Sequence, residues 1–287
     1  MIPSLRSVVH FLRERNRTRL AKHRERERTR QSEQYVGTRA VAGIMKDEVR
    51  NLDEWISHYL QLGADRIVLV DNGSTDGSFA RAQRWVDKGS VDLISRPERH
   101  RQADHVWEAT NAFVLGKYQW LLVADLDEFW FCPDGSKLSS KLCTSDFFDV
   151  DVIYANWKMF GSSGLKAHPQ SIRTSLVHRQ VGLEAHRNSK YICRTSVLRF
   201  RSNFGVHKVS GADSARTVSD NQAFHLFHYP IQSLEYFQEV KMTRGDAMSS
   251  RSDNVRDMAY FLRHDAVCTQ EDRTLATLVE EGRLGSA

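Results

Sequence analysis

Cysteine is scarce in this chain of 287 residues, and its four cysteines show no CxxC or CxxxH spacing. That pattern excludes a cysteine-based zinc site and a disulfide framework, and it indicates reduced thiols. No stretch approaches the roughly 20 apolar residues that a membrane span needs. The N-terminus also lacks the apolar core and the small-residue cleavage site of a signal peptide. We therefore expect a cytoplasmic protein.

Two common nucleotide-binding signatures are missing as well. The loop that follows Val70 contains neither the GxGxxG of a dinucleotide site nor the GxxxxGK[ST] of a phosphate loop. These absences count against a hydride-transfer enzyme and an ATPase. They also count against the interpretation as a metal-dependent nucleotidyltransferase or phosphohydrolase, because such an enzyme would need a site for a nucleoside triphosphate.

Positive charge is concentrated at the N-terminal end. Residues 1–34 hold ten Arg and Lys against four Glu, a net charge of +6, so the remainder of a chain with net charge +5 carries −1. Leu5, Val8, Val9 and Leu12 follow helical spacing in this basic arm. A basic amphipathic helix can lie on an anionic membrane, so we expect either peripheral contact at the inner face of the membrane or a solvated arm. No nucleic acid is expected, because no aromatic residue interrupts residues 13–34.

Predicted strands and helices alternate after the arm. Apolar, β-branched runs predict strands, and apolar residues at three- and four-residue spacing predict helices. The predicted strands are residues 39–45, 66–70, 91–94 and 120–124, and the predicted helices are residues 51–63, 79–85 and 103–115. This alternation predicts a mostly parallel sheet with right-handed crossovers.

The chain is organised around an apolar run, Trp120 to Ala124, which ends at Asp125, Asp127 and Glu128. Ligands of open α/β sheets gather at the carboxyl ends of such buried strands. In an extended segment Asp125 and Asp127 point to one side, and Glu128 points to the other. Two carboxylates on one side suit Mg²⁺ or Mn²⁺ that carries a phosphate. The alternative is an acidic turn that caps the next element.

These motifs, taken in order, resemble the GT-A nucleotide-sugar glycosyltransferases, in the family 2-like branch that is related to family 92. The matching blocks are Lys46-Asp47-Glu48, Glu54-Trp55-Ile56, His58-Tyr59, DNGSTDGS at residues 71–78, DLDEF at 125–129, WKMFGSSG at 157–164, SKYICR at 189–194, VHK at 206–208, and HLFHYPIQS at 225–233 with Lys241 and Arg244-Gly245. The resemblance spans roughly residues 38–247. One departure is Asp47, where the branch usually has Asn.

The resemblance implies an α/β fold of the GT-A, Rossmann-like type. Its mostly parallel sheet is flanked by helices, and a smaller mixed C-terminal region lies on the acceptor side. From the resemblance, together with the charge pattern and the apolar spacing at the two ends, we expect three parts: the basic arm (1–34), a GT-A domain (35–250) and C-terminal helices (251–287) that pack on the domain or mediate association. Residues 282–287 are expected to be frayed.

The activity that the resemblance implies is a metal-dependent, inverting transfer of a hexose. The donor would be a nucleoside diphosphate sugar, with UDP as the expected nucleotide. The acceptor would be a glycan or a lipid-linked molecule in surface polysaccharide synthesis. The alternative from another class is a non-catalytic protein of the same fold that binds a nucleotide sugar or a partner.

Several residues become candidates for donor binding through this resemblance. Asp127 would hold Mn²⁺ or Mg²⁺, Asp125 would contact the metal or the ribose, and His207 or His228 would be a third metal ligand or a diphosphate contact. Asp71 would accept a hydrogen bond from a uracil N–H, unless it caps a turn. The remaining candidates for donor contact are Glu48, Asp76, Gln102, Lys190 and Lys241.

The catalytic base stays open at this point. An inverting transferase needs a carboxylate or an imidazole beside the acceptor, and Glu128, Glu184 and His228 have suitable side chains. The glycine-flanked loop at residues 160–164 could close over the sugar or form a plain hairpin turn. Trp157 could stack on a sugar or fill the core.

Overall fold

The computed structural model describes residues 38–182, 189–244 and 256–284. The basic arm and Glu184 therefore lie outside the described residues. No helix in the described part of the chain is long and apolar enough to cross a membrane.

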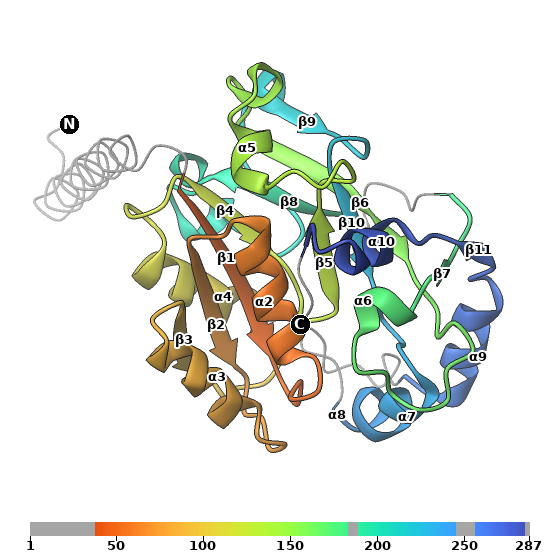
Figure 1. The fold of residues 1–287 in the computed structure, drawn as a ribbon. Coiled ribbons are helices and arrows are strands. Elements are labelled where there is room, and N and C mark those ends of the chain that lie inside the picture. The colour runs from red at the N-terminus through yellow and green to blue at the C-terminus, as the bar shows by residue number, and fades with distance from the viewer. Residues whose placement is uncertain (1–37, 183–188, 245–255, 285–287) are drawn as a thin grey trace, which may run out of the picture.

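The first half of the described chain is the predicted parallel sheet. Its strands are β1 (Arg39–Met45), β2 (Arg66–Asp71), β3 (Val91–Ser95) and β4 (Trp120–Val123), and they lie in the order β3-β2-β1-β4, all parallel. The connecting helices are α2 (Leu52–Leu62), α3 (Ser78–Asp87) and α4 (Gln102–Phe113). The predicted alternation is confirmed (Figure 1).

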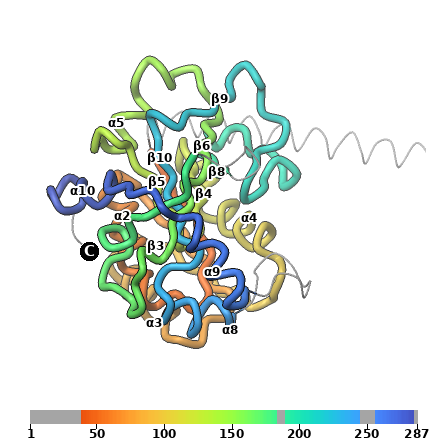
Figure 2. The backbone as a smooth tube through the Cα atoms, turned by 90° about the vertical axis from the view of Figure 1, so that its right-hand side faces the viewer, coloured from red at the N-terminus to blue at the C-terminus, as the bar shows by residue number. Residues whose placement is uncertain are grey.

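Side chains alternate between the two faces of this sheet because successive residues of a strand point in opposite directions. Val41 packs with α2 on one face, whereas Ala40 and Ala42 pack with α4 on the other. Figure 2 shows the result from the side, with α2 and α10 on one side of the sheet and α4 on the other.

The second half extends the same sheet with strands of mixed direction. These are β5 (Glu128–Phe131), β6 (Val152–Met159), β8 (Ser189–Arg194), β9 (Thr217–Ser219) and β10 (His225–His228), and the order continues β4-β8-β6-β10-β5, with β9 beside β6. Strand β8 is antiparallel to both β4 and β6, and β10 is antiparallel to β5 but parallel to β6. The expected mixed C-terminal region is therefore present.

Short elements complete the second half. They are α5 (Leu138–Leu142), α6 (Ile172–Ser175), β7 (His178–Arg179), α7 (Leu234–Tyr236), a π-helical turn (Phe237–Lys241), α8 (Met242–Arg244), α9 (Met258–Ala266), β11 (Gln270–Glu271) and α10 (Thr274–Glu280), with four 3-10 turns between them (Ser145–Phe147, Thr195–Val197, Arg201–Asn203 and Ser214–Arg216). Leu275, Leu278 and Leu284 belong to the same hydrophobic core as α2 and β5. The expected fraying is wrong for residues 282–284, because Leu284 is only 2% exposed and its carbonyl accepts a hydrogen bond from Arg173.

The glycine-flanked loop at residues 160–164 is anchored away from the cavity described below. The Asp265 carboxylate of α9 accepts hydrogen bonds from the backbone N–H and the hydroxyl of Ser162, at 2.6 and 2.9 Å. The Ser163 hydroxyl accepts from the backbone N–H groups of Val177 and His178, at 2.8 and 3.0 Å. A side chain at Gly161 would collide with Cys268. These contacts do not support a lid over the sugar.

Candidate active site

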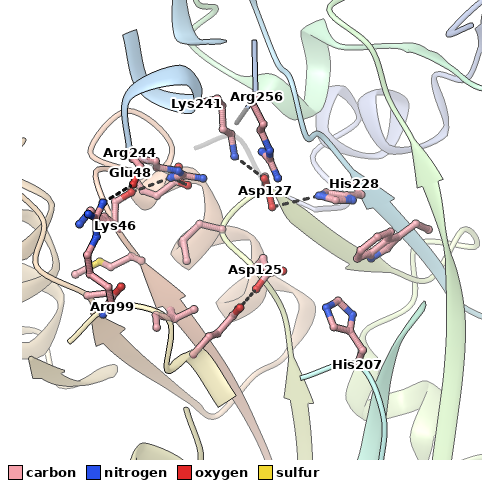
Figure 3. A pocket seen from close by; sticks show the side chains of 16 residues that line it. Lys46, Glu48, Arg99, Asp125, Asp127, His207, His228, Lys241, Arg244 and Arg256 are labelled. Carbon is pink, nitrogen blue, oxygen red and sulfur yellow. Dashed lines mark hydrogen bonds and ion pairs between the residues drawn. The ribbon is translucent and has the colours of Figure 1, made fainter. Parts of the chain in front are cut away.

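A cavity of about 270 Å³ lies at the carboxyl ends of β1 and β4. Its charged side chains come from both halves of the chain (Figure 3), and they are Lys46, Glu48, Arg99, Asp125, Asp127, Lys241, Arg244 and Arg256. Gln102, Trp157, His207 and His228 also line it. Of the residues predicted for donor binding, Asp71, Asp76 and Lys190 do not reach the wall of this cavity.

The two aspartates lie in a tight turn, so the expectation of an extended segment is wrong. Strand β4 ends at Val123, and the Glu128 N–H donates to the Asp125 carbonyl at 3.0 Å. The Glu128 carboxylate folds back and accepts a hydrogen bond from the Asp125 N–H at 2.9 Å. Glu128 is fully buried and absent from the cavity wall. It supports the turn from beneath.

Helix α2 holds the same turn from the other side. Trp55 donates its indole N–H to the Asp125 carbonyl at 2.9 Å, and the Tyr59 hydroxyl donates to the Glu128 carbonyl at 3.0 Å. Both side chains are fully buried. The aromatic residues at these positions therefore fix the backbone that carries the carboxylates.

Asp125 is held by two donors. Lys190 Nζ donates to Oδ2 and Gln102 Nε2 donates to Oδ1, each at 2.9 Å. Burial, the largest single influence, acts to raise the pKa of Asp125, but Lys190 and His207 together bring that pKa below its usual value. Burial raises the pKa of Glu128 well above its usual value, although Lys190 lies 3.6 Å away. The two shifts have opposite directions, so the ionised form is favoured at Asp125 and the protonated form at Glu128.

Asp127 faces a different pair of groups. Lys241 Nζ donates to Oδ2 at 2.6 Å, and His228 Nε2 lies 3.5 Å from Oδ1. Burial opposes ionisation of Asp127, yet Lys241 and His228 hold its pKa well below the usual range. Burial lowers the pKa of Lys241 to about 8. Lys241 ends the π-helical turn, a local widening that often marks functional sites.

Arginines close the cavity beyond Glu48. Arg244 donates to the Glu48 carboxylate and, at 2.8 Å, to the Lys46 carbonyl. The Tyr236 hydroxyl donates to the second Glu48 oxygen. Arg99 donates to the Arg244 carbonyl at 3.3 Å, and Arg256 donates to the Pro230 carbonyl at 3.2 Å.

Sequence reasoning missed Lys46, Arg99 and Arg256 as cavity residues. Arg99 follows the third strand, so its place after a strand end of the parallel sheet was an available signal. Arg256 lies beyond the last matching block, and no pattern near it indicates a site.

The other end of the cavity is aromatic. The Trp157 ring lies 4.4 Å from the ring of His228 and 5.5 Å from that of His207, centroid to centroid. His207 Nδ1 lies 3.2 Å from the backbone carbonyl of Ser189. Burial and then the Lys190 charge lower the pKa of His207, against the opposite influence of Asp125.

The loop after β2 is used differently from the prediction. The Asp71 carboxylate accepts from the backbone N–H groups of Gly73 and Ser74, each at 3.2 Å. Asp76 accepts from the N–H groups of Ser78 and Val49, at 2.9 and 3.0 Å. These contacts are turn and cap contacts, as the sequence allowed. Asn72 lines the cavity instead.

The expected third metal ligand does not join the aspartates in this arrangement. Among the described residues, no three His, Cys, Asp or Glu side chains gather closely enough to hold a metal ion. Asp127 and His228 nevertheless offer a carboxylate and an imidazole side by side. Mg²⁺ and Mn²⁺ sites often use one or two such ligands and complete their shell with substrate phosphates and water. The donor set therefore fits a metal that arrives with a diphosphate.

The comparison with protein families decides the classification. The sequence profile of glycosyltransferase family 92 matches residues 41–261, which is most of the chain. The chain belongs to glycosyltransferase family 92. The match includes Arg256 and the start of α9, so the family 92 region extends beyond residue 247, where the resemblance in sequence motifs ended.

Two plant members of family 92 are similar to this chain. A family 92 protein of Ricinus communis is 26% identical over 213 residues, which are 69% of this chain and 36% of that protein. One of Arabidopsis thaliana is 24% identical over 261 residues, 79% of this chain and 42% of that protein. The chain thus spans about two fifths or less of these relatives.

Solved structures of glycosyltransferases are more distant. Residues 1–349 of TarS of S. aureus, in complex with UDP-GlcNAc, are 14% identical with a TM-score of 0.48, and the match covers 75% of this family 92 chain and 61% of that TarS chain. Glucosyl-3-phosphoglycerate synthase of Mycobacterium tuberculosis, solved with Mn²⁺ and UDP, is 17% identical with a TM-score of 0.34 over 56% and 58% of the two chains.

Proposed function

We propose that this family 92 chain transfers a hexose from a UDP-sugar to a hydroxyl group of a glycan or a lipid-linked acceptor, with inversion and with a divalent metal. One observation carries the proposal. The turn with Asp125 and Asp127 shares its cavity with five cationic side chains, namely Lys46, Arg99, Lys241, Arg244 and Arg256.

The charges of the cavity suit a diphosphate. Lys241 and Arg244 pair with Asp127 and Glu48. In the described part of the chain, the other three cations contact no carboxylate, and Arg99 and Arg256 donate only to backbone carbonyls. Cations without a counter-ion in a cavity attract an anionic ligand, and guanidinium groups match phosphate oxygens in geometry. A leaving diphosphate would be stabilised here.

Asp127 and His228 would hold the metal, with Asp125 behind them. When bound, the metal would neutralise charge on the leaving diphosphate. Lys190 and Gln102 keep Asp125 ionised and in place. Because Lys241 already donates to Oδ2 of Asp127, the Oδ1 edge beside His228 is the side open to a metal.

Asn72 is our candidate for nucleobase recognition, in place of Asp71. Both hydrogens of Asn72 Nδ2 are used, since they point to the carbonyls of Arg96 and Glu98 at 2.5 and 2.9 Å. This fixes the amide, so Oδ1 is the atom left to accept. Uracil presents an N–H at the matching edge, whereas cytosine presents a bare nitrogen that Oδ1 would repel.

Calorimetric titration with UDP tests the proposal. We expect binding in the presence of Mn²⁺, weaker by about ten- to a hundredfold with chelator or in Asp127→Asn, because a charge-assisted contact is lost. Asp149→Asn is the matched control, since that side chain is 86% exposed. CDP should bind more weakly than UDP, and Asn72→Leu should reduce the difference.

Two outcomes would change the assignment. Absence of UDP binding under every condition would remove the uridine donor. Binding of UDP without hydrolysis or transfer of any UDP-hexose would favour the non-catalytic alternative.

A further inference from the structure

The two ends of the cavity have opposite chemistry. Figure 3 shows Lys46, Arg99 and Arg244 on one side of the two aspartates and His207 on the other side. The cationic end suits the diphosphate that leaves. In the proposed inverting reaction the acceptor hydroxyl attacks from the side opposite the leaving group. With the diphosphate held by the cations and by the metal between Asp127 and His228, we place that hydroxyl on the side of His207.

The hydrogen bonding of His207 fixes which of its ring nitrogens is free. A carbonyl only accepts, so the contact between Nδ1 and the Ser189 carbonyl at 3.2 Å places a hydrogen on Nδ1. In the neutral ring, Nε2 then carries the lone pair. No side chain among the described residues donates to that atom. Because Nδ1 donates to the Ser189 carbonyl, Nε2 of His207 is left as a hydrogen-bond acceptor. The ring lines the cavity.

The other basic groups of the cavity are occupied. The three carboxylates in its wall each bind a cation: Glu48 binds Arg244, Asp125 binds Lys190 and Asp127 binds Lys241. His228 turns Nε2 to Asp127, and its Nδ1 is buried with no partner in the described structure. His207 is the remaining imidazole in the cavity wall.

The surroundings of His207 keep it uncharged. Burial is the main influence that lowers its pKa. Lys190 of β8 and His228 of β10 act in the same direction, while Asp125 acts against them. A neutral imidazole near pH 7 can take a proton, which is the first requirement of a general base.

We propose that His207 is the general base of the transfer reaction, an inference that rests on the proposed function. Nε2 takes the proton of the acceptor hydroxyl while that oxygen forms a bond to the anomeric carbon. The bond from this carbon to the diphosphate oxygen breaks, and its electron pair leaves with the diphosphate. The imidazolium then returns the proton to water.

Hydrolysis of UDP-glucose and UDP-galactose, with water as acceptor, tests the role without knowledge of the natural acceptor. In His207→Gln and His207→Ala we expect kcat to fall about 10²- to 10⁴-fold. UDP affinity should stay unchanged, and added imidazole should restore part of the activity of His207→Ala. His225→Gln is the matched control, because His225 lies on β10 three residues before His228 and contacts Lys158 at 3.1 Å.

A spectroscopic measurement determines the protonation state and tautomer of His207 without reference to enzymatic activity. Nitrogen-15 NMR of the wild-type protein at pH 7, assigned with His207→Gln, should show the hydrogen on Nδ1. A hydrogen on Nε2, or a charged ring, would overturn the proposal. So would wild-type hydrolysis rates in His207→Gln, a loss of UDP binding in that variant, or a loss of activity confined to Glu184→Gln. If the wild type binds UDP but hydrolyses no UDP-hexose, the proposed function fails, and the NMR result still decides the state of His207.

Discussion

The two halves of the described chain build one cavity in different ways. Residues 39–131 contribute all three carboxylates, together with Lys46 and Arg99, from the ends of regular parallel strands, where the topology of the sheet brings them together. Residues 132–284 contribute bases from a loop, a π-helical turn and strands of mixed direction. Asp125 and Lys190 are 65 positions apart in sequence, and Asp127 and Lys241 are 114 apart.

Several buried ion pairs of the described structure join the halves, with the acid from the first half. They include Glu48–Arg244, Glu54–Arg173, Asp125–Lys190, Glu128–Lys190 and Asp127–Lys241. A buried ion pair often adds little net stability, but removal of one partner is costly because it leaves an uncompensated charge. The pairs therefore specify how the halves fit together. Substitutions that break them distinguish an effect on the stability of the fold from an effect on the position of the cavity side chains.

Lys190→Met should have the largest effect. Lys190 is fully buried and is the only ammonium within 4 Å of Asp125 in the described structure, so its loss should destabilise the fold by about 3–5 kcal/mol. UDP binding should weaken as well, because Asp125 loses its orienting donor. Urea denaturation measures the first effect and calorimetry the second. Lys141→Met is the control, since it breaks an exposed pair with Asp134 and should cost at most about 1 kcal/mol. Equal losses in the two variants would contradict the prediction.

Arg173→Met should come next and should affect stability alone. Glu54 would lose its guanidinium but keep donors in the Ser171 hydroxyl and the Ile172 N–H. We therefore expect a smaller loss, about 2–3 kcal/mol, in urea denaturation. The pair lies outside the cavity, so UDP affinity should be retained. A loss of UDP affinity in the folded variant would show that the Glu54–Arg173 pair also positions the cavity side chains.

Gly43→Ala tests the first half by itself. An added Cβ would lie 3.0 Å from the Ala124 carbonyl oxygen and 3.0 Å from the Trp55 ring, both of which support the aspartate turn. Overpacking of this kind costs about 1–3 kcal/mol. Thermal unfolding measures the loss. Ala82→Gly in α3 is the comparison, because it removes a buried methyl group and lowers helix propensity without overpacking. Gly89→Ala is unsuitable as a control, because Gly89 has a φ of +83°. A melting temperature equal to that of the wild type would show that the contact relaxes without cost.

Lys158→Met should change stability by an amount that depends on pH. Burial lowers the pKa of Lys158 to about 8, although Asp272 opposes the shift. Between pH 8 and the unfolded value of 10.5, the unfolded chain binds more protons, so wild-type stability should rise with pH. The variant should be more stable than the wild type at pH 7, and this advantage should shrink by pH 10. Urea denaturation at the two pH values measures it, and a constant difference would contradict the assigned pKa.

The sequence predicted the parallel half well because its signals are local. Apolar runs and helical spacing predicted β1 to β4 and the three helices between them, and the structure has each of them. The blocks that resemble glycosyltransferases also indicated the correct family. The extended backbone expected at Asp125 was wrong because the chain turns there, although Glu128 does point away from the cavity that Asp125 and Asp127 line. At the end of β2, Asn72 lines the cavity and Asp71 does not.

What the sequence alone determined is the set of acids and the sheet that presents them, because strand ends and hydrophobic periodicity depend on neighbouring residues. Only the tertiary structure decided which base meets which acid. Lys190 and Lys241 were expected to contact the donor, and Arg173 matched no pattern. All three are buried partners of acids, because β8, the π-helical turn and α6 pack against the first half. A buried charge is stable only with its partner, because an unpaired charge inside a protein is costly. No local sequence pattern encodes a partner more than 60 positions away.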